Sequence, residues 1–164
     1  MIELKVSIDI DRPAAEIWRI VADFGQDPRW RAGVTTMAPD PPGLVVPGTT
    51  TDETLRIAGR GFYISGLVTS VVPGREFLWR GTSGIDVEGG RSVVPLDDDR
   101  CRVTMWFRLR LPGLLRLRAP MLERMLRRKL QQNVRRLADL VSTDAWRRPR
   151  GTATSRDRCP RSSR

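Results

Sequence analysis

Two stretches near the ends of the chain alternate between apolar and polar residues. Apolar side chains occupy every second position from Ile2 to Ile10, and the same alternation runs from Arg102 to Leu111. A period of two is typical of a half-buried β-strand, with one face toward a core and the other toward solvent. We therefore predict a strand in each stretch, both with an apolar inner face.

The segment from Thr49 to Leu111 is rich in β-forming residues and is divided by short turn-forming sequences. These divisions recur about every ten residues, a spacing typical of an antiparallel meander. We expect five strands in this segment. The predicted turns lie at Ala58–Gly61, Pro73–Gly74, Ser83–Gly84, Gly89–Gly90 and Asp97–Asp99.

Two short helices are predicted after the first strand. Asp11 lies two residues before Pro13, which suits the first turn of a helix that should run to about Asp23. Gly25 and Pro28 then interrupt the helical pattern, and a second short helical turn is expected to carry Trp30. An extended segment follows at Val34–Met37, and the proline-rich and glycine-rich sequence of residues 39–48 predicts a loop.

The last regular element predicted is a long amphipathic helix. An apolar stripe at helical spacing runs from Leu122 to Val141. The arginines of this stretch fall largely off the stripe, and we interpret them as a solvated face. Contact of this face with a membrane surface or a nucleic acid is the alternative interpretation. Residues 143–164 lack hydrophobic periodicity and are predicted to form a disordered tail, which leaves residues 1–142 as one domain.

Composition excludes several functional classes. Histidine is absent from the 164 residues, which rules out a Ser-His-Asp triad and imidazole metal sites. The two cysteines have no spacing suited to a disulfide framework or a zinc site, so we expect no metal and no cofactor. No apolar run reaches the length of a membrane span, and no secretory signal is recognisable, which predicts a cytoplasmic protein.

The net charge of +10 is unevenly distributed along the chain. Residues 143–164 carry seven arginines and two aspartates, and so supply half of this charge. Basic residues in the rest of the chain are mostly matched by acidic ones. The charge therefore does not favour a nucleic acid as the partner.

The sequence resembles a known family at both ends. The segment IDIDRPAAEIWRIVADFGQDPRW resembles the opening of the polyketide cyclase/dehydrase and lipid-transport group of the START-like (SRPBCC) superfamily, with Pro13, Trp18, Asp23 and Trp30 in corresponding places. The helix at residues 120–141, entered through glycine, is similar to the C-terminal helix of that family. The resemblance covers residues 1–142.

This resemblance implies an α+β helix-grip fold. A curved antiparallel sheet of about seven strands, two short helices and a long C-terminal helix would then enclose a cavity. Members of the superfamily use such a cavity for sterols, lipids, quinones, polyketides or plant hormones. A small hydrophobic molecule is accordingly the expected ligand.

Three residues are candidates for chemistry in such a cavity. In the strand that begins near Thr49, alternation places Glu53 on the same face as Leu55. A buried Glu53 could act as a general acid or base, unless a cation such as Arg91 compensates its charge; the alternative is a structural ion pair or a strand-end residue in solvent. Tyr63 could offer a phenol to a ligand carbonyl, although the sequence does not determine which face of its strand it occupies.

Further residues are predicted to line the cavity. Trp30 is expected beside the entrance, where the helix of the first segment is broken. Apolar residues on inward strand faces supply the rest of the wall, although core packing is their more frequent role. The predicted ligand-binding residues are Trp30, Glu53, Tyr63, Trp79, Arg91, Met105 and Phe107.

Three functions follow from this interpretation. The main prediction is binding of a lipid or polyketide-like molecule in the cavity. The first alternative is a cyclase or aromatase in which Glu53, Tyr63 and Arg91 hold and protonate a substrate. The second is an interaction module whose basic helix and tail dock on an acidic partner. The sequence does not determine the ligand or the oligomeric state.

Overall fold

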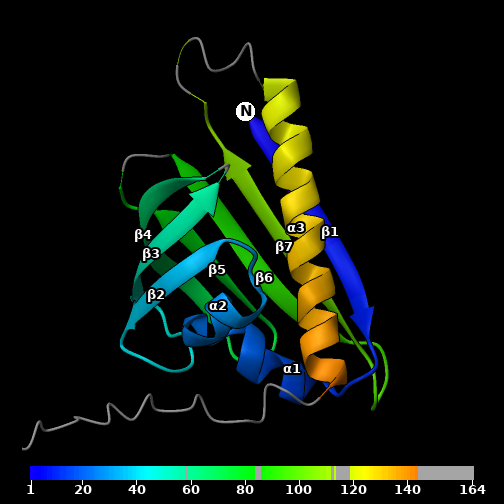
Figure 1. The fold of residues 1–164 in the computed structure, drawn as a ribbon. Coiled ribbons are helices and arrows are strands. Elements are labelled where there is room, and N and C mark those ends of the chain that lie inside the picture. The colour runs from blue at the N-terminus through cyan, green and yellow to red at the C-terminus, as the bar shows by residue number, and fades with distance from the viewer. Residues whose placement is uncertain (58, 84–85, 112, 114–118, 144–164) are drawn as a thin grey trace, which may run out of the picture.

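The computed structural model describes residues 1–57, 59–83, 86–111, 113 and 119–143. Within them, seven strands form one antiparallel sheet in the order β1-β7-β6-β5-β4-β3-β2, which curves around a long helix (Figure 1). The predicted α+β helix-grip fold is confirmed. The strands are β1 (Ile2–Ile10), β2 (Val34–Asp40), β3 (Thr50–Ile57), β4 (Arg60–Val72), β5 (Glu76–Gly81), β6 (Val87–Pro95) and β7 (Cys101–Leu109). The helices are α1 (Ala14–Val21), the 3-10 turn η1 (Phe24–Gln26), α2 (Asp27–Trp30) and α3 (Ala119–Ser142).

The first and last strands pair directly, although they lie at opposite ends of the domain sequence. Ile2 pairs with Leu109 and Ile10 with Cys101 in an unbroken antiparallel register. Alternate residues of both strands are buried on one face, as the period of two predicts. The inner faces of the two strands together form one apolar surface, and α3 packs on this surface.

Helices cover the concave face of the sheet. The C-terminal half of α3 packs on β1 through Leu130, Val134, Leu137 and Val141, which recur at helical spacing and are all buried. At the same end of the molecule α1 lies against β6 (Figure 1). Phe77 of β5 packs edge to face against the rings of Trp18 in α1 and Phe24 in η1. The core is therefore filled at the end where α3 finishes.

The prediction of a turn at Gly89–Gly90 is wrong, because both glycines lie inside β6. A β-carbon at Gly89 would lie 2.7 Å from a ring atom of Trp79, and one at Gly90 would lie 2.6 Å from the indole nitrogen of Trp106. Glycine is thus required here by large side chains of the neighbouring strands. Such close approach is a second reason for glycine in a strand, besides turns and bulges.

Two other boundaries differ from the predicted ones. The first helix ends at Val21, and Asp23 instead caps η1 by accepting a hydrogen bond from the Gly25 amide at 2.9 Å. The extended segment after it continues to Asp40, into the predicted loop. The predicted turn residues Ala58 and Gly84, the helix entry at residues 114–118 and the tail beyond residue 143 lie outside the described residues.

Candidate ligand-binding site

A cavity of about 890 Å³ lies between the sheet and the N-terminal half of α3. Its volume falls in the range of small-molecule sites, and most of its lining side chains are apolar, as in such sites generally. The strands β3 to β7 supply one wall, and the α3 residues Leu122, Met125, Leu126, Lys129 and Leu130 supply the other. These helix residues recur every three or four positions, so they share one face of α3.

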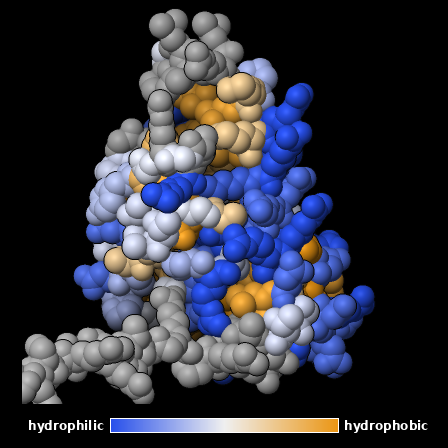
Figure 2. All heavy atoms as spheres, viewed as in Figure 1, coloured by the Kyte–Doolittle hydropathy of each residue, from blue (hydrophilic) through white to orange (hydrophobic). Residues whose placement is uncertain are grey.

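The cavity meets solvent at the end of the molecule where α3 begins. The lining residues with exposed side chains include Phe62, Asp86 and Arg110, and Met125 is also partly exposed. Figure 2 shows hydrophobic surface gathered at this end, beside a hydrophilic band along α3. Among the described residues, the core fills the opposite end of the space between the sheet and α3.

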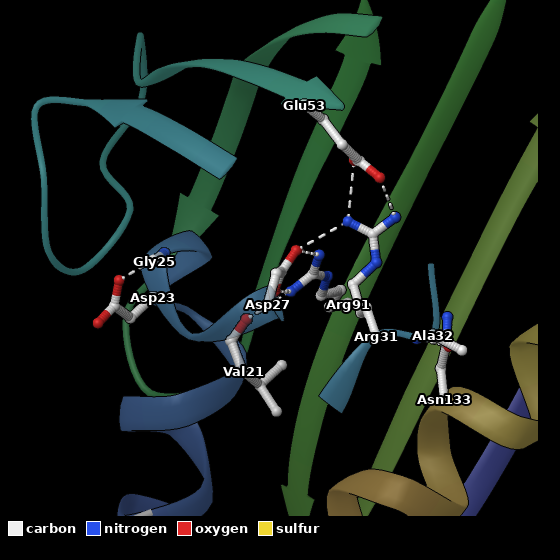
Figure 3. Close-up of polar contacts among 9 residues, drawn as sticks. All are labelled: Val21, Asp23, Gly25, Asp27, Arg31, Ala32, Glu53, Arg91 and Asn133. Atoms are coloured by element: carbon white, nitrogen blue, oxygen red, sulfur yellow. Dashed lines mark hydrogen bonds and ion pairs between the residues drawn. The ribbon is translucent and has the colours of Figure 1, made fainter. Parts of the chain in front are cut away.

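The inner end of the cavity is built on a buried ion pair between Arg91 and Asp27. The guanidinium of Arg91 donates hydrogen bonds to the two carboxylate oxygens of Asp27 at 2.7 and 2.6 Å, and a third to the carbonyl of Val21 at 3.1 Å (Figure 3). Arg91 and Asp27 are 3% and 0% exposed. This two-pronged geometry is the strongest form of such a pair.

Aromatic rings enclose the Arg91 guanidinium. Its central carbon lies 4.9 Å from the ring centre of Phe24, 5.1 Å from that of Trp30 and 5.6 Å from that of Phe77. Rings at these distances attract a cation through their electron-rich faces. The rings and the Asp27 carboxylate together allow a full positive charge to remain in the core.

A second pair, between Arg31 and Glu53, continues this network toward the cavity. Arg31 donates to the two oxygens of Glu53, both at 2.9 Å, and also to Asp27 at 2.8 Å (Figure 3). Burial by itself lowers the pKa of the Arg31 guanidinium, but the nearby Glu53 and Asp27 carboxylates outweigh this effect and raise that pKa. The network contains two guanidiniums and two carboxylates, so it is electrically neutral.

Local structure explains how the two arginines reach the same carboxylate. Asp27 and Arg31 lie four residues apart across α2, a spacing that brings side chains onto one helix face. The chain after Arg31 is held to α3, because the amide of Ala32 donates to the side-chain oxygen of Asn133 at 2.8 Å. Asn133 therefore positions the segment that carries Arg31.

Lys129 is the remaining cation of the inner cavity wall. Its ammonium donates to the carbonyl of Arg56 at 3.3 Å. Burial lowers the pKa of Lys129, the positive charge of Arg31 lowers it further, and Glu53 acts in the opposite direction. No carboxylate among the described residues lies within ion-pairing distance of this ammonium. Lys129, whose side chain is partly exposed, thus adds one positive charge without a carboxylate partner to the border of a mostly apolar space.

The structure places most of the predicted site residues at the cavity. Glu53, Trp79, Arg91, Met105 and Phe107 all line it. That they bind a ligand stays a prediction. The cation that pairs with Glu53 is Arg31, not Arg91 as the sequence suggested.

Two predicted residues lie elsewhere. Tyr63 is on the outer face of β4 and is 64% exposed, so its phenol does not face the cavity. Its strand alternates, and the neighbouring Ile64 lines the cavity instead. Trp30 is fully buried behind Arg91 and is not a wall residue. Its indole supports the buried guanidinium rather than the entrance.

Three polar residues of this site were not found from the sequence. Asp27 and Arg31 had one recognisable signal, an acid and a base four residues apart around a short helix. Lys129 lies seven residues after Leu122 and so falls on the apolar stripe of α3. A charge on an apolar stripe was the signal that could have identified it.

The described residues include neither a metal site nor a membrane-spanning helix. No group of three or more acidic or cysteine side chains there is placed to hold a metal ion. The described part of the chain also contains no helix long and apolar enough to cross a bilayer.

The fold and the cavity together define a helix-grip protein with an internal cavity. Residues 1–142 match the family described as polyketide cyclase / dehydrase and lipid transport. The chain therefore belongs to this family. No curated protein matches it.

Solved structures share the fold at low sequence identity. A START superfamily protein of Mycobacterium smegmatis is 16% identical, with a TM-score of 0.70 over 87% of this chain and 99% of its own. The Zhui aromatase/cyclase of a Streptomyces species is 15% identical, with a TM-score of 0.70 over 91% and 97% of the two chains. A Thermus thermophilus protein is 12% identical, with a TM-score of 0.73 over 87% and 99%.

Proposed function

We propose that the protein binds a small, mostly apolar molecule in the cavity between the sheet and α3. The observation that carries this proposal is the cavity itself, about 890 Å³ in volume and bordered by apolar side chains such as Leu55, Ile64 and Leu126. A space of this size exposes apolar surface unless a ligand fills it, and covering that surface is favourable. The membership of the chain in a family whose description includes lipid transport supports the same function.

The inner polar network supports selective binding. Buried polar groups fix the orientation of a ligand in an otherwise apolar site. Glu53 and Arg31 are the members of the network that line the cavity together, and Arg91 lines it beside them. The proposed ligand therefore carries at least one polar group, directed toward these residues.

Native mass spectrometry of the protein purified from its own host's lysate tests this proposal. A bound molecule should appear as a mass shift that disappears on denaturation, and organic extraction should recover it for identification. Titration of the purified protein with the uncharged fluorophore N-phenyl-1-naphthylamine provides a second measurement, since this dye becomes fluorescent in apolar surroundings. Absence of both a co-purified molecule and saturable dye binding would contradict the proposal.

A cyclase or aromatase activity is the second candidate. The Zhui protein is named an aromatase/cyclase, and this chain carries the carboxylate of Glu53 at the inner cavity wall. Glu53 accepts two hydrogen bonds from Arg31. This ion pair would have to open before Glu53 could act as an acid or base. Tyr63, on the outer face, is no part of this candidate mechanism.

Glu53→Gln separates the two candidates. An enzyme that uses Glu53 as its acid or base should lose turnover of a poly-β-ketone substrate by about 100-fold or more. A binding protein should retain its affinity for N-phenyl-1-naphthylamine in the same variant. Turnover that survives the substitution would remove Glu53 from the mechanism.

Docking of the protein on an acidic partner and a cytoplasmic location remain predictions.

A further inference from the structure

Lysine is rare in this chain, which makes its presence in the cavity informative. Only Lys5 and Lys129 are lysines among the 29 basic residues; all the others are arginines. Lys5 is exposed on β1, whereas Lys129 lines the cavity. Its neighbours on the same face of α3 are Met125, Leu126 and Leu130, so packing alone does not require a charge at this position.

The charges of the inner cavity wall balance except at Lys129. Arg91 gives its hydrogen bonds to Asp27 and to the Val21 carbonyl, and Arg31 gives its own to Glu53 and Asp27. Both guanidiniums are thus neutralised by carboxylates. At the cavity mouth Arg110 lies 3.6 Å from Asp86, and both side chains are well exposed, where solvent screens their charges.

The Lys129 ammonium has donors available for a ligand. An ammonium carries three N–H donors, and the structure accounts for one of them, at 3.3 Å from the Arg56 carbonyl. The side chain of Lys129 is partly buried at the border of the apolar cavity, so its charge is only partly solvated. An oxyanion beside Lys129 would compensate this charge and would form charge-assisted hydrogen bonds.

We infer that the ligand is an organic monoanion, an apolar body with one carboxylate or enolate oxygen, and that Lys129 binds this oxygen. This inference rests on the proposed function and names the ligand class of the same cavity. A single charge is specified because the inner wall has one uncompensated cation. A phosphate dianion would bring a second negative charge close to Glu53 without a cation to balance it.

Displacement of N-phenyl-1-naphthylamine by dodecanoate and by its methyl ester tests the inference. The two competitors share an apolar chain and differ in the negative charge. The wild-type protein should bind dodecanoate about tenfold more tightly than the ester, since hydrogen bonds to charged groups are the stronger ones. Lys129→Gln should abolish this preference and leave binding of the ester unchanged, which also shows that the variant is folded.

Two further variants control for charge and for surface effects. Lys129→Arg retains a cation at the site and should retain most of the preference for dodecanoate. Lys5→Gln removes the other lysine, on the exposed side of β1, and should have no effect on either competitor. A preference for dodecanoate that persists in Lys129→Gln would overturn the role of Lys129.

The outcomes distinguish this inference from the proposed function. If the dye binds and wild-type protein does not prefer dodecanoate over its ester, the cavity binds apolar ligands but the inference is wrong. If neither the dye nor either competitor binds, the proposed function fails and the inference fails with it. A charge-dependent preference that disappears only in Lys129→Gln supports both.

Nuclear magnetic resonance of protein labelled with ¹⁵N-lysine gives an independent readout, because only two side-chain signals are expected. The groups facing Lys129 with a charge are Arg31 and Glu53. Dodecanoate should shift the Lys129 signal and raise the pKa of its ammonium, since a nearby anion favours the protonated form. The methyl ester should leave this pKa unchanged; an equal effect of both competitors would contradict the inference.

Discussion

Arg91 and Asp27 form a doubly hydrogen-bonded ion pair in the core although 64 residues separate them in the sequence. The pair joins strand β6, which lies between β7 and β5 in the sheet, to the short helix α2, and so it fixes one end of the cavity. Asp27 also accepts a hydrogen bond from Arg31, whereas Arg91 has no other carboxylate partner among the described residues. The two members of the pair are therefore not equivalent.

Asp27→Asn should destabilise the protein by about 3 to 5 kcal/mol, because it leaves Arg91 as a buried charge without a counterion. Arg91→Met should cost less, about 1 to 3 kcal/mol, because Asp27 keeps its bond to Arg31. The free energy of unfolding in urea measures both changes. A larger loss for Arg91→Met than for Asp27→Asn would show that Arg31 does not compensate Asp27.

Ile64 and Tyr63 are neighbours on β4 that point to opposite faces of the sheet. Ile64→Trp should fill part of the cavity and weaken binding of N-phenyl-1-naphthylamine by about tenfold or more, because added side-chain volume removes the space for the ligand. Tyr63→Trp places the same side chain on the exposed face and should change the affinity by less than about twofold. Equal effects of the two variants would locate dye binding outside the cavity.

Cys101 should make stability decline at alkaline pH. Burial raises the pKa of its thiol to about 11, with a smaller contribution from the negative charge of Asp9. An unfolded thiol titrates near 8.5, so the unfolded state loses its proton first as the pH rises. The stabilisation is therefore complete below about pH 8.5 and is lost between there and about pH 11, by about 3 kcal/mol.

Urea unfolding of the Cys159→Ser protein across this pH range measures the effect of Cys101. Cys101→Ala in the same background is the control, because it removes the thiol whose titration is followed. The difference in unfolding free energy between the two proteins should shrink as the pH rises. A difference that is constant from pH 8 to pH 11 would show that the thiol titrates at its ordinary value.

Deletion of residues 143–164 tests the domain boundary. The family match ends at residue 142, and none of the described cavity-lining residues lies beyond Leu130. The shortened protein should bind N-phenyl-1-naphthylamine with unchanged affinity and unfold at about the same urea concentration. A loss of binding would mean that the basic C-terminal segment contributes to the site.

Alternation and periodicity predicted most of the fold because burial of one face is a local property of a strand or helix. The apolar positions of β1, β7 and α3 could be assigned from spacing alone, and so could the inward face that carries Glu53. Predictions failed where a glycine or an aromatic residue had two interpretations. Gly89 was predicted to form a turn. In the structure it lies in a strand, where Trp79 of the adjacent strand occupies the space that a β-carbon would need.

The sequence by itself determined the order of the elements and the exclusion of histidine chemistry, because these depend on composition and on nearest neighbours along the chain. Only the tertiary structure decided the partners of the charged groups. Asp27 could have paired with Arg31 alone, and the approach of β6 brought Arg91 to it. Pairing of charges depends on distances between elements far apart in sequence, so the neutral Arg31–Glu53 pair and the uncompensated charge of Lys129 became visible only in the folded chain.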